Sequence, residues 1–111
     1  MKDCIFCKII AGEIPCKKVY EDEFCLAFHD INPRSPIHIL VVPKIHLEAA
    51  HHIGDYPDKN TANHLFSAVG NIVKEQNLIE KGYRLVINNG KGAGQEVFHL
   101  HIHIMSGFGG K

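Results

Sequence analysis

The feature that most constrains this chain is a row of three histidines, His99, His101 and His103, which alternate with apolar residues. Side chains of a β-strand point alternately to its two faces, so the pattern predicts a strand over residues 97–105. The three imidazoles would lie about 7 Å apart along one face. The opposite face would belong to the core and would consist of Phe98, Leu100, Ile102 and Ile104.

A solvated strand face normally carries Lys, Thr, Glu or Ser, so three histidines in a row indicate a chemical role. Imidazole titrates near neutral pH and serves as a base, a nucleophile or a metal ligand. Two interpretations therefore fit the row. The imidazoles share a metal ion, or one imidazole attacks an electrophile while its neighbours hold the anion.

A glycine-rich segment directly upstream of the row favours the second interpretation. Gly90, Gly92 and Gly94 permit positive backbone angles, so that successive amides can point at a phosphate, and Gln95 adds a side-chain donor. Alone, such a segment is more often a simple hairpin connection. Next to the histidine row it indicates an oxyanion target, with phosphorus as the reacting centre.

Composition and charge limit the domain count and the classes of partner. The chain has 111 residues and is 45% hydrophobic, which predicts one domain over residues 1–111. The 12 basic residues balance the 12 acidic ones, which argues against nucleic acid or a membrane surface as a partner. The apolar runs are shorter than the roughly 20 residues of a membrane span, and residues 1–10 lack a signal-peptide pattern, so we expect a soluble cytoplasmic protein.

The periodicity of apolar residues predicts an α+β fold on an antiparallel sheet of about five strands. A short helix is expected over residues 4–11, capped by Asp3 and stopped by Gly12. A long helix is expected from Asn60 or Thr61 to near Leu78. The expected strands cover residues 17–21, 24–29, 38–42, 83–88 and 97–105.

The four cysteines all lie in the N-terminal quarter, which is typical of reduced thiols or metal ligands and not of a disulfide scaffold. Cys4 and Cys7 share one side of the predicted short helix and could chelate an ion. They could equally be two small buried side chains. Cys16 is expected in a turn and Cys25 in the core of a strand.

Residues 99–105 match the HxHxHxx signature, x being apolar, of the histidine triad superfamily. Residues 9–15, 28–33, 38–46, 82–88 and 94–95 are similar to its Hint branch, the nucleoside phosphoramidate hydrolases. The resemblance implies that His101 attacks the α-phosphorus of a purine nucleotide and forms a transient nucleotidyl-histidine. Water then releases the nucleoside monophosphate.

The resemblance also assigns the other site residues. His103 and His38 resemble the remaining phosphate-side histidines, and Asn88, Gly94 and Gln95 resemble the residues that bind and orient the phosphate. Asp30 resembles the acid that binds the ribose. Without the family match, Asp30 could simply start a turn. The apolar slot for the base is represented by Phe28, which could otherwise be plain core, and by Ile31.

In some members with an N-terminal cysteine pair, the family further implies a structural Cys₂His₂ zinc site. Here that set consists of Cys4, Cys7, His46 and His99. The family also implies a homodimer, with residues 65–73 and 83–88 as candidates for the interface.

One departure from the family concerns Glu96, which stands where the Hint branch usually has a serine near the phosphate. A carboxylate there would repel an anionic substrate unless it turns outward. Two other function classes remain open: a noncatalytic nucleotide-binding partner protein, and a metal-dependent phosphohydrolase that uses the histidine row as ligands.

Overall fold

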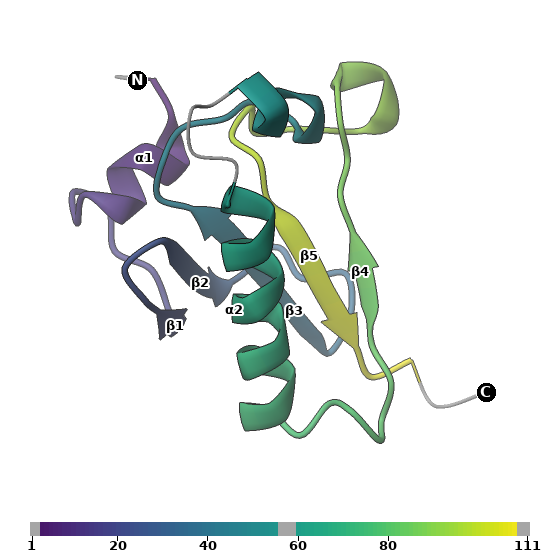
Figure 1. The fold of residues 1–111 in the computed structure, drawn as a ribbon. Helices are drawn as coiled ribbons and strands as arrows, with labels where there is room; N and C mark the ends of the chain where they lie inside the picture. The colour runs from purple at the N-terminus through teal and green to yellow at the C-terminus, as the bar shows by residue number, and fades with distance from the viewer. Residues whose placement is uncertain (1–2, 56–59, 109–111) are drawn as a thin grey trace.

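A five-stranded antiparallel sheet forms the centre of the computed structural model, which describes residues 3–55 and 60–108 (Figure 1). The strand order is β1-β2-β3-β5-β4. The elements are α1 (Ile5–Ile10), β1 (Lys18–Glu21), β2 (Cys25–His29), β3 (Ile37–Pro43), α2 (Thr61–Glu75), β4 (Arg84–Val86) and β5 (Ile102–Ser106), with 3₁₀ turns η1 (Ala50–Asp55) and η2 (Lys91–Ala93). This confirms the predicted α+β fold. No described helix is long and apolar enough to cross a bilayer.

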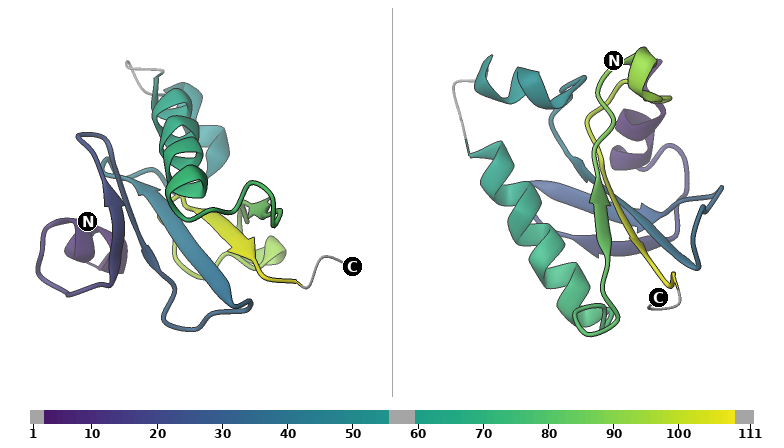
Figure 2. Two further views of the ribbon diagram at one scale, coloured as in Figure 1. Left: turned by 90° about the horizontal axis from the view of Figure 1, so that it is seen from below. Right: turned by 90° about the vertical axis from the view of Figure 1, so that its right-hand side faces the viewer.

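The two helices lie on opposite sides of the sheet (Figure 2). Helix α2 presents its apolar stripe, which includes Leu65, Val69 and Ile72, to the main core. Helix α1 covers part of the other face, where Phe6 packs in a smaller apolar cluster with Phe28 and its neighbours. Burial of these faces removes apolar surface from water, which is the main stabilising contribution to such a fold.

The central strands β2 and β3 are buried on both faces, so their residues divide between the two clusters. In β2, Cys25 and Ala27 belong to the α2 side and Leu26 and Phe28 to the α1 side. The core position expected for Cys25 is confirmed, since it is fully buried. Strand β5 continues the same division, because Ile102 and Ile104 belong to the α2 side. His103 therefore points to the α1 side.

The predicted strand over residues 97–105 is wrong in its first half, because β5 begins only at Ile102. Residues 97–101 form no strand ladder, and the Leu100 amide donates a hydrogen bond to the Leu47 carbonyl at 2.6 Å. Phe98, expected in the core, is 45% exposed as a result, whereas Leu100 is buried as predicted. The alternation of the sequence is preserved, but a regular strand ladder is not.

The other element ends also differ from the predictions. The expected strand over residues 83–88 is reduced to β4. Helix α2 ends at Glu75, because Asn77 adopts a left-handed backbone angle (φ 58°) and the Leu78 amide closes back onto the Val73 carbonyl. Helix α1 is capped by Cys4 and not by Asp3, since the Cys4 sulfur accepts the Cys7 amide at 3.3 Å.

Candidate functional site

A cavity of about 370 Å³ lies on the α1 side of the sheet. Its apolar wall comes from α1 and the segment after it, and includes Phe6, Ile9 and Ile14. The lining also brings together seven residues that the sequence assigned to the site: Phe28, Asp30, Ile31, Asn88, Gly94, His101 and His103. Residues far apart in the chain thus meet around one space, where aromatic and aliphatic groups lie beside imidazoles. Such a mixture suits a ligand with an apolar ring and an anionic group.

His101 is held with one nitrogen committed to the main chain. Its Nδ1–H donates to the His99 carbonyl oxygen at 2.7 Å, which leaves Nε2 without a proton. The ring is buried and lines the cavity. Burial lowers the pKa of His101 below its usual range, so the neutral, nucleophilic form dominates at neutral pH. An imidazole in this state can attack an electrophile through Nε2.

His38 and His103 form a directed hydrogen-bond chain. The Arg34 amide donates to His38 Nδ1 at 3.0 Å, so the proton of this ring sits on Nε2. His38 Nε2–H then donates to His103 Nδ1 at 2.8 Å. The proton of His103 is thereby placed on Nε2, a buried atom that has no hydrogen-bond partner in the described chain. This series of hydrogen bonds leaves the His103 Nε2–H available as a donor beside His101.

Both rings of this chain are neutral at neutral pH. Burial, together with the neighbouring imidazoles, lowers the pKa of His103 to about 4. Burial also lowers the pKa of His38, although the Asp30 carboxylate at 3.4 Å from its Nε2 opposes this effect. A bound phosphate would therefore meet the neutral N–H donor of His103 and not an imidazolium cation.

Asp30 both starts a turn and lines the cavity. Its Oδ1 accepts the Asn32 amide at 2.8 Å, which starts the turn before β3. Its Oδ2 faces His38, and the residue lines the cavity. Ile31 lies next to it on the rim and is 89% exposed. The Asp30 side chain thus stabilises the turn and places a carboxylate at the cavity.

Two of the predicted catalytic and nucleotide-binding residues do not line the cavity. One is His38, which is hydrogen-bonded to the cavity residue His103. The other is Gln95. It is buried, and its Oε1 accepts the Gly90 amide at 2.7 Å. Its Nε2 donates to the carbonyls of Glu48 and Val97 at 2.6 and 3.0 Å. Both ends of the Gln95 amide are hydrogen-bonded to main-chain groups, so Gln95 holds the glycine-rich segment in place. Its neighbour Gly94 does line the cavity.

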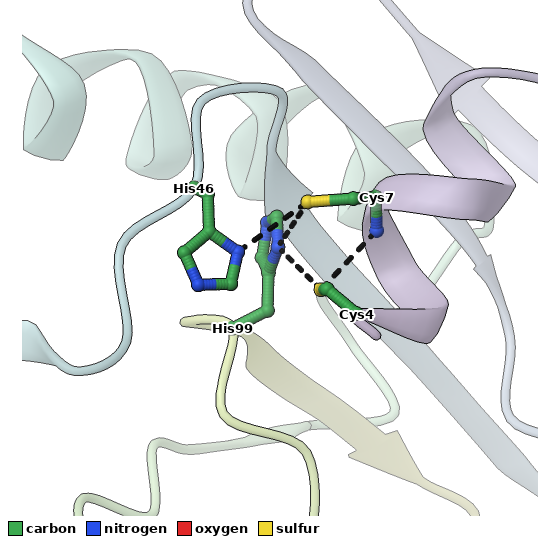
Figure 3. A group of neighbouring side chains, drawn as sticks. All are labelled: Cys4, Cys7, His46 and His99. Atoms are coloured by element: carbon green, nitrogen blue, oxygen red, sulfur yellow. Dashed lines mark hydrogen bonds between the residues drawn. The ribbon is translucent and has the colours of Figure 1, made fainter. Parts of the chain in front are cut away.

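Cys4, Cys7, His46 and His99 converge beside the cavity, as the family resemblance implied (Figure 3). Their ligand atoms all lie within 4.8 Å of one another, with Cys4 Sγ to His99 Nδ1 and Cys7 Sγ to His46 Nδ1 both at 3.3 Å. Tetrahedral zinc with Zn–S near 2.3 Å and Zn–N near 2.0 Å separates such atoms by roughly 3.5 Å. The donor set and its spacing therefore fit a structural zinc ion.

The surroundings of the group support the same fit. His99 Nε2–H donates to the Pro43 carbonyl at 2.8 Å, which leaves Nδ1 unprotonated and turned toward the sulfurs. Burial lowers the pKa of His99 to about 4 and so keeps the ring neutral. Burial and the Cys4 neighbour raise the pKa of Cys7 to about 11. Only a cation at this position would make the deprotonated thiol favourable.

The three histidines of the row do not meet at one point. Among the described residues, a second group that could hold an ion consists of Asp30, His38 and His103. The 2.8 Å separation of its two imidazole nitrogens is a hydrogen-bond length. His99 belongs to the cysteine group and His101 to the cavity, so the interpretation of the row as one ligand set is not supported.

Several residues of the site were not predicted from the sequence, among them Phe6 and Arg34. Phe6 lies between the two cysteines and sets its ring edge-on to His101, with centroids 5.1 Å apart. Its position in the CxFC pattern gave no sign of this contact. Arg34 fixes the His38 tautomer through its backbone amide. No side-chain pattern can predict a contact made by the main chain.

The chain is similar to known proteins in sequence and in fold. A family model described as HIT domain matches residues 11–110. Protein HitA of Neisseria gonorrhoeae is 47% identical over 105 residues, which is 95% of this chain and 96% of that protein. A histidine triad protein from Clostridium difficile has a similar structure, with a TM-score of 0.88, 49% identity, and coverage of 96% of this chain and 92% of that one.

A second solved structure, described as a HIT family hydrolase from Legionella pneumophila, has a TM-score of 0.84 and 41% identity. The match covers 95% of this chain and 93% of the Legionella chain. Sequence and structure therefore agree over nearly the whole length. The chain belongs to the HIT domain family.

Proposed function

We propose that the protein is a nucleotide hydrolase of the Hint type, which cleaves purine nucleoside 5′-phosphoramidates to the nucleoside monophosphate. The observation that carries the proposal is the unprotonated Nε2 of His101 in the cavity wall beside the free N–H of His103. The similar structure from Legionella pneumophila is described as a HIT family hydrolase, and this description supports a hydrolytic reaction.

In the first step His101 Nε2 uses its lone pair to form a bond to phosphorus. The phosphorus–nitrogen bond breaks, and the departing amine takes a proton from solvent. In the second step water adds to phosphorus, the bond to His101 breaks, and the lone pair returns to Nε2. The water proton goes to solvent, so both atoms and charge balance.

The neighbouring groups would stabilise the charge that develops on the non-bridging oxygens. His103 Nε2–H is a fixed donor, since its tautomer is set by His38 and in turn by Arg34. A donor that is already oriented costs no reorganisation during the reaction. Asp30 would accept hydrogen bonds from ribose hydroxyls, and Phe28 and Ile31 would contact the base.

The test is a comparison of His101→Ala with His51→Ala, an exposed imidazole outside the cavity. We expect His101→Ala to lower the turnover of adenosine 5′-phosphoramidate by on the order of 10³-fold or more, while AMP binding by calorimetry persists. Mass spectrometry of the quenched wild type should detect a nucleotide adduct on His101. His51→Ala should behave as wild type, and full turnover by His101→Ala would refute the mechanism.

A noncatalytic nucleotide-binding protein is the second candidate, because the same cavity would bind a nucleotide without chemistry. It predicts AMP binding together with no turnover of any amidate by the wild type.

We further propose a cytoplasmic location. Cys4 and Cys7 lie together without forming a disulfide, which agrees with a reducing compartment such as the cytoplasm.

We also propose that the chain forms a homodimer through α2 and β4. Strand β4 lies at an edge of the sheet, and large apolar side chains around it and on α2 are exposed, notably Phe66 (53%), Ile79 (59%) and Leu85 (38%). An edge strand with apolar neighbours favours pairing with a second copy. Sedimentation at micromolar concentration should give the mass of two chains, and a monomer alone would refute the dimer.

A further inference from the structure

Arg34 and Glu96 form an ion pair in the lining of the cavity that contains His101. Arg34 Nη2–H donates to Glu96 Oε1 at 2.9 Å. Arg34 lies in the turn between β2 and β3, whereas Glu96 lies 62 positions later, in the segment between η2 and β5. Asp30 in the first segment and Gly94 in the second also line the cavity. The pair thus joins two distant segments that both contribute to the site.

Arg34 is bound at two places. Its guanidinium pairs with Glu96, and its main-chain amide donates to His38 Nδ1 at 3.0 Å. The second contact fixes the His38 tautomer, which in turn places the proton of His103 on Nε2. The position of the Arg34 backbone therefore decides which nitrogen of His103 can donate to a phosphate.

The two partners of the pair lie on segments that are held differently. Next to Glu96, the buried Gln95 side chain is hydrogen-bonded to main-chain groups up to 47 positions away, so this segment is anchored to distant parts of the fold. In the turn of Arg34, the hydrogen bonds of the Asn32 amide and the Ser35 hydroxyl join residues only two positions apart. A carboxylate on the anchored segment therefore restrains a turn whose own contacts are local.

The pair also changes the electrostatic effect expected of Glu96. An unpaired carboxylate in this lining would repel an anionic substrate, whereas the Arg34 guanidinium offsets its charge at 2.9 Å. The two side chains are 66% and 76% exposed, so water screens the attraction and the pair is weak. Any effect of Glu96 through Arg34 is therefore modest in size.

We propose that Glu96 is a positioning residue for the reaction. Its ion pair holds the turn so that the Arg34 amide stays bound to His38, and His38 then keeps the His103 Nε2–H available to the phosphate. This inference rests on the proposed function. Glu96 makes no contact with the reacting atoms in this role and acts only through Arg34.

The first test is the steady-state kinetics of Glu96→Gln with adenosine 5′-phosphoramidate. We expect kcat to fall about twofold, with about fivefold as the most that an exposed ion pair explains, while KM does not rise. Repulsion alone predicts a different result, because removal of the carboxylate would lower KM and leave kcat unchanged. Glu21→Gln removes the carboxylate of ion pairs with Lys18 and Lys44 outside the cavity lining and should keep the wild-type kcat.

A double-mutant cycle separates the ion pair from other effects of the substitution. Arg34→Gln removes the guanidinium and keeps the main-chain amide, so we expect the same fall in kcat as in Glu96→Gln. The two substitutions together should add no further loss, because they remove one interaction. Arg34→Glu combined with Glu96→Arg restores opposite charges and should recover at least about half of the wild-type kcat.

NMR of the histidine ring nitrogens gives a readout that does not depend on turnover. In the wild type, His38 and His103 should both be protonated on Nε2. In Glu96→Gln the Nδ1-protonated form of His38 should become detectable, because its Nδ1 loses the steady contact with the Arg34 amide. Glu21→Gln should give the wild-type spectrum.

The outcomes separate this inference from the proposed function. An unchanged kcat in Glu96→Gln, a further loss in the double glutamine variant, or unchanged ring-nitrogen spectra would overturn the positioning role. His101-dependent turnover by the wild type would leave the proposed function intact in each of these cases. If the wild type turned over no amidate, the proposed function would fail, and the NMR comparison would still decide whether Glu96 holds the His38 tautomer.

Discussion

The protonation state of a single residue controls the proposed chemistry. His101 must be neutral to attack, and burial keeps its pKa below 6.5 even though the His99 hydrogen bond and the charges of Asp30 and Glu96 oppose that shift. The neutral fraction is lost only as pH falls through the pKa of the folded protein. The reactive form is therefore present throughout the neutral range.

The acid limb of kcat/KM should consequently have its midpoint below pH 6.5. Asp30→Asn removes a negative charge that favours the imidazolium, so it should move that midpoint to still lower pH, separately from any loss of nucleotide affinity. A pH profile of kcat/KM for an uncharged-leaving-group substrate measures both effects. A wild-type midpoint at or above pH 7 would contradict this account of His101.

Gln95 contributes through contacts with the main chain, at a distance from the reacting atoms. Replacement by Ala would remove the hydrogen bonds that the buried Gln95 side chain makes with the Glu48 carbonyl and the Gly90 amide, which should cost about 1–3 kcal/mol of the free energy of unfolding. Gln76→Ala, at the C-terminal end of α2, should change it by less than about 0.5 kcal/mol. Urea denaturation compares the two, and equal effects would show that the Gln95 contacts are not stabilising.

At the scale of elements, α1 is a short helix of six residues that depends on tertiary contacts. The cysteine group joins it to the segment after β3 through His46 and to the segment before β5 through His99 (Figure 3). The same helix supplies Phe6 and Ile9 to the cavity that contains His101. A zinc ion at the group would therefore hold a wall of the site.

Purified wild-type protein should contain one zinc per chain by elemental analysis, and Cys7→Ser should lose it. Because the ion would bind the folded form, its loss should lower the Tm by on the order of 5 °C or more and raise amide exchange in α1. Cys16→Ser, outside the group, should retain the metal. Wild type that lacks zinc after growth with zinc supplied would remove the proposal.

At the scale of the whole molecule, neutral buried imidazoles link stability to pH. The pKa of His103 is about 4 in the folded protein and near 6.5 when the chain is unfolded. Between these values the unfolded chain binds more protons, so the free energy of unfolding rises with pH in that window and decreases on acidification. Above pH 6.5 this histidine makes no pH-dependent contribution.

We therefore expect the free energy of unfolding to fall between pH 7 and pH 5. His103→Gln removes this titrating group and should show a smaller decrease over the same interval. Urea denaturation of both proteins at the two pH values gives the comparison. An identical pH dependence would show that His103 is not depressed in the folded state.

The sequence by itself determined the elements and most of the site. Short-range periodicity decides whether a segment becomes a helix or a strand, so α2, β2 and β3 were predicted close to their actual positions. The family motifs identified the cavity residues because the histidine row and the Asp30 segment are contiguous in sequence. Residue type and local spacing were sufficient for these features.

The tertiary structure alone decided how those residues work. The tautomers of His38 and His101 depend on the Arg34 amide and the His99 carbonyl, and the Gln95 amide is committed to main-chain groups up to 47 positions away. Strand β5 starts only at Ile102 and Phe98 is exposed, while the Leu100 amide bonds the Leu47 carbonyl, 53 positions away, outside any strand ladder. Every residue except proline carries the same main-chain donor and acceptor, so their partners are set only when the folded chain brings distant segments together.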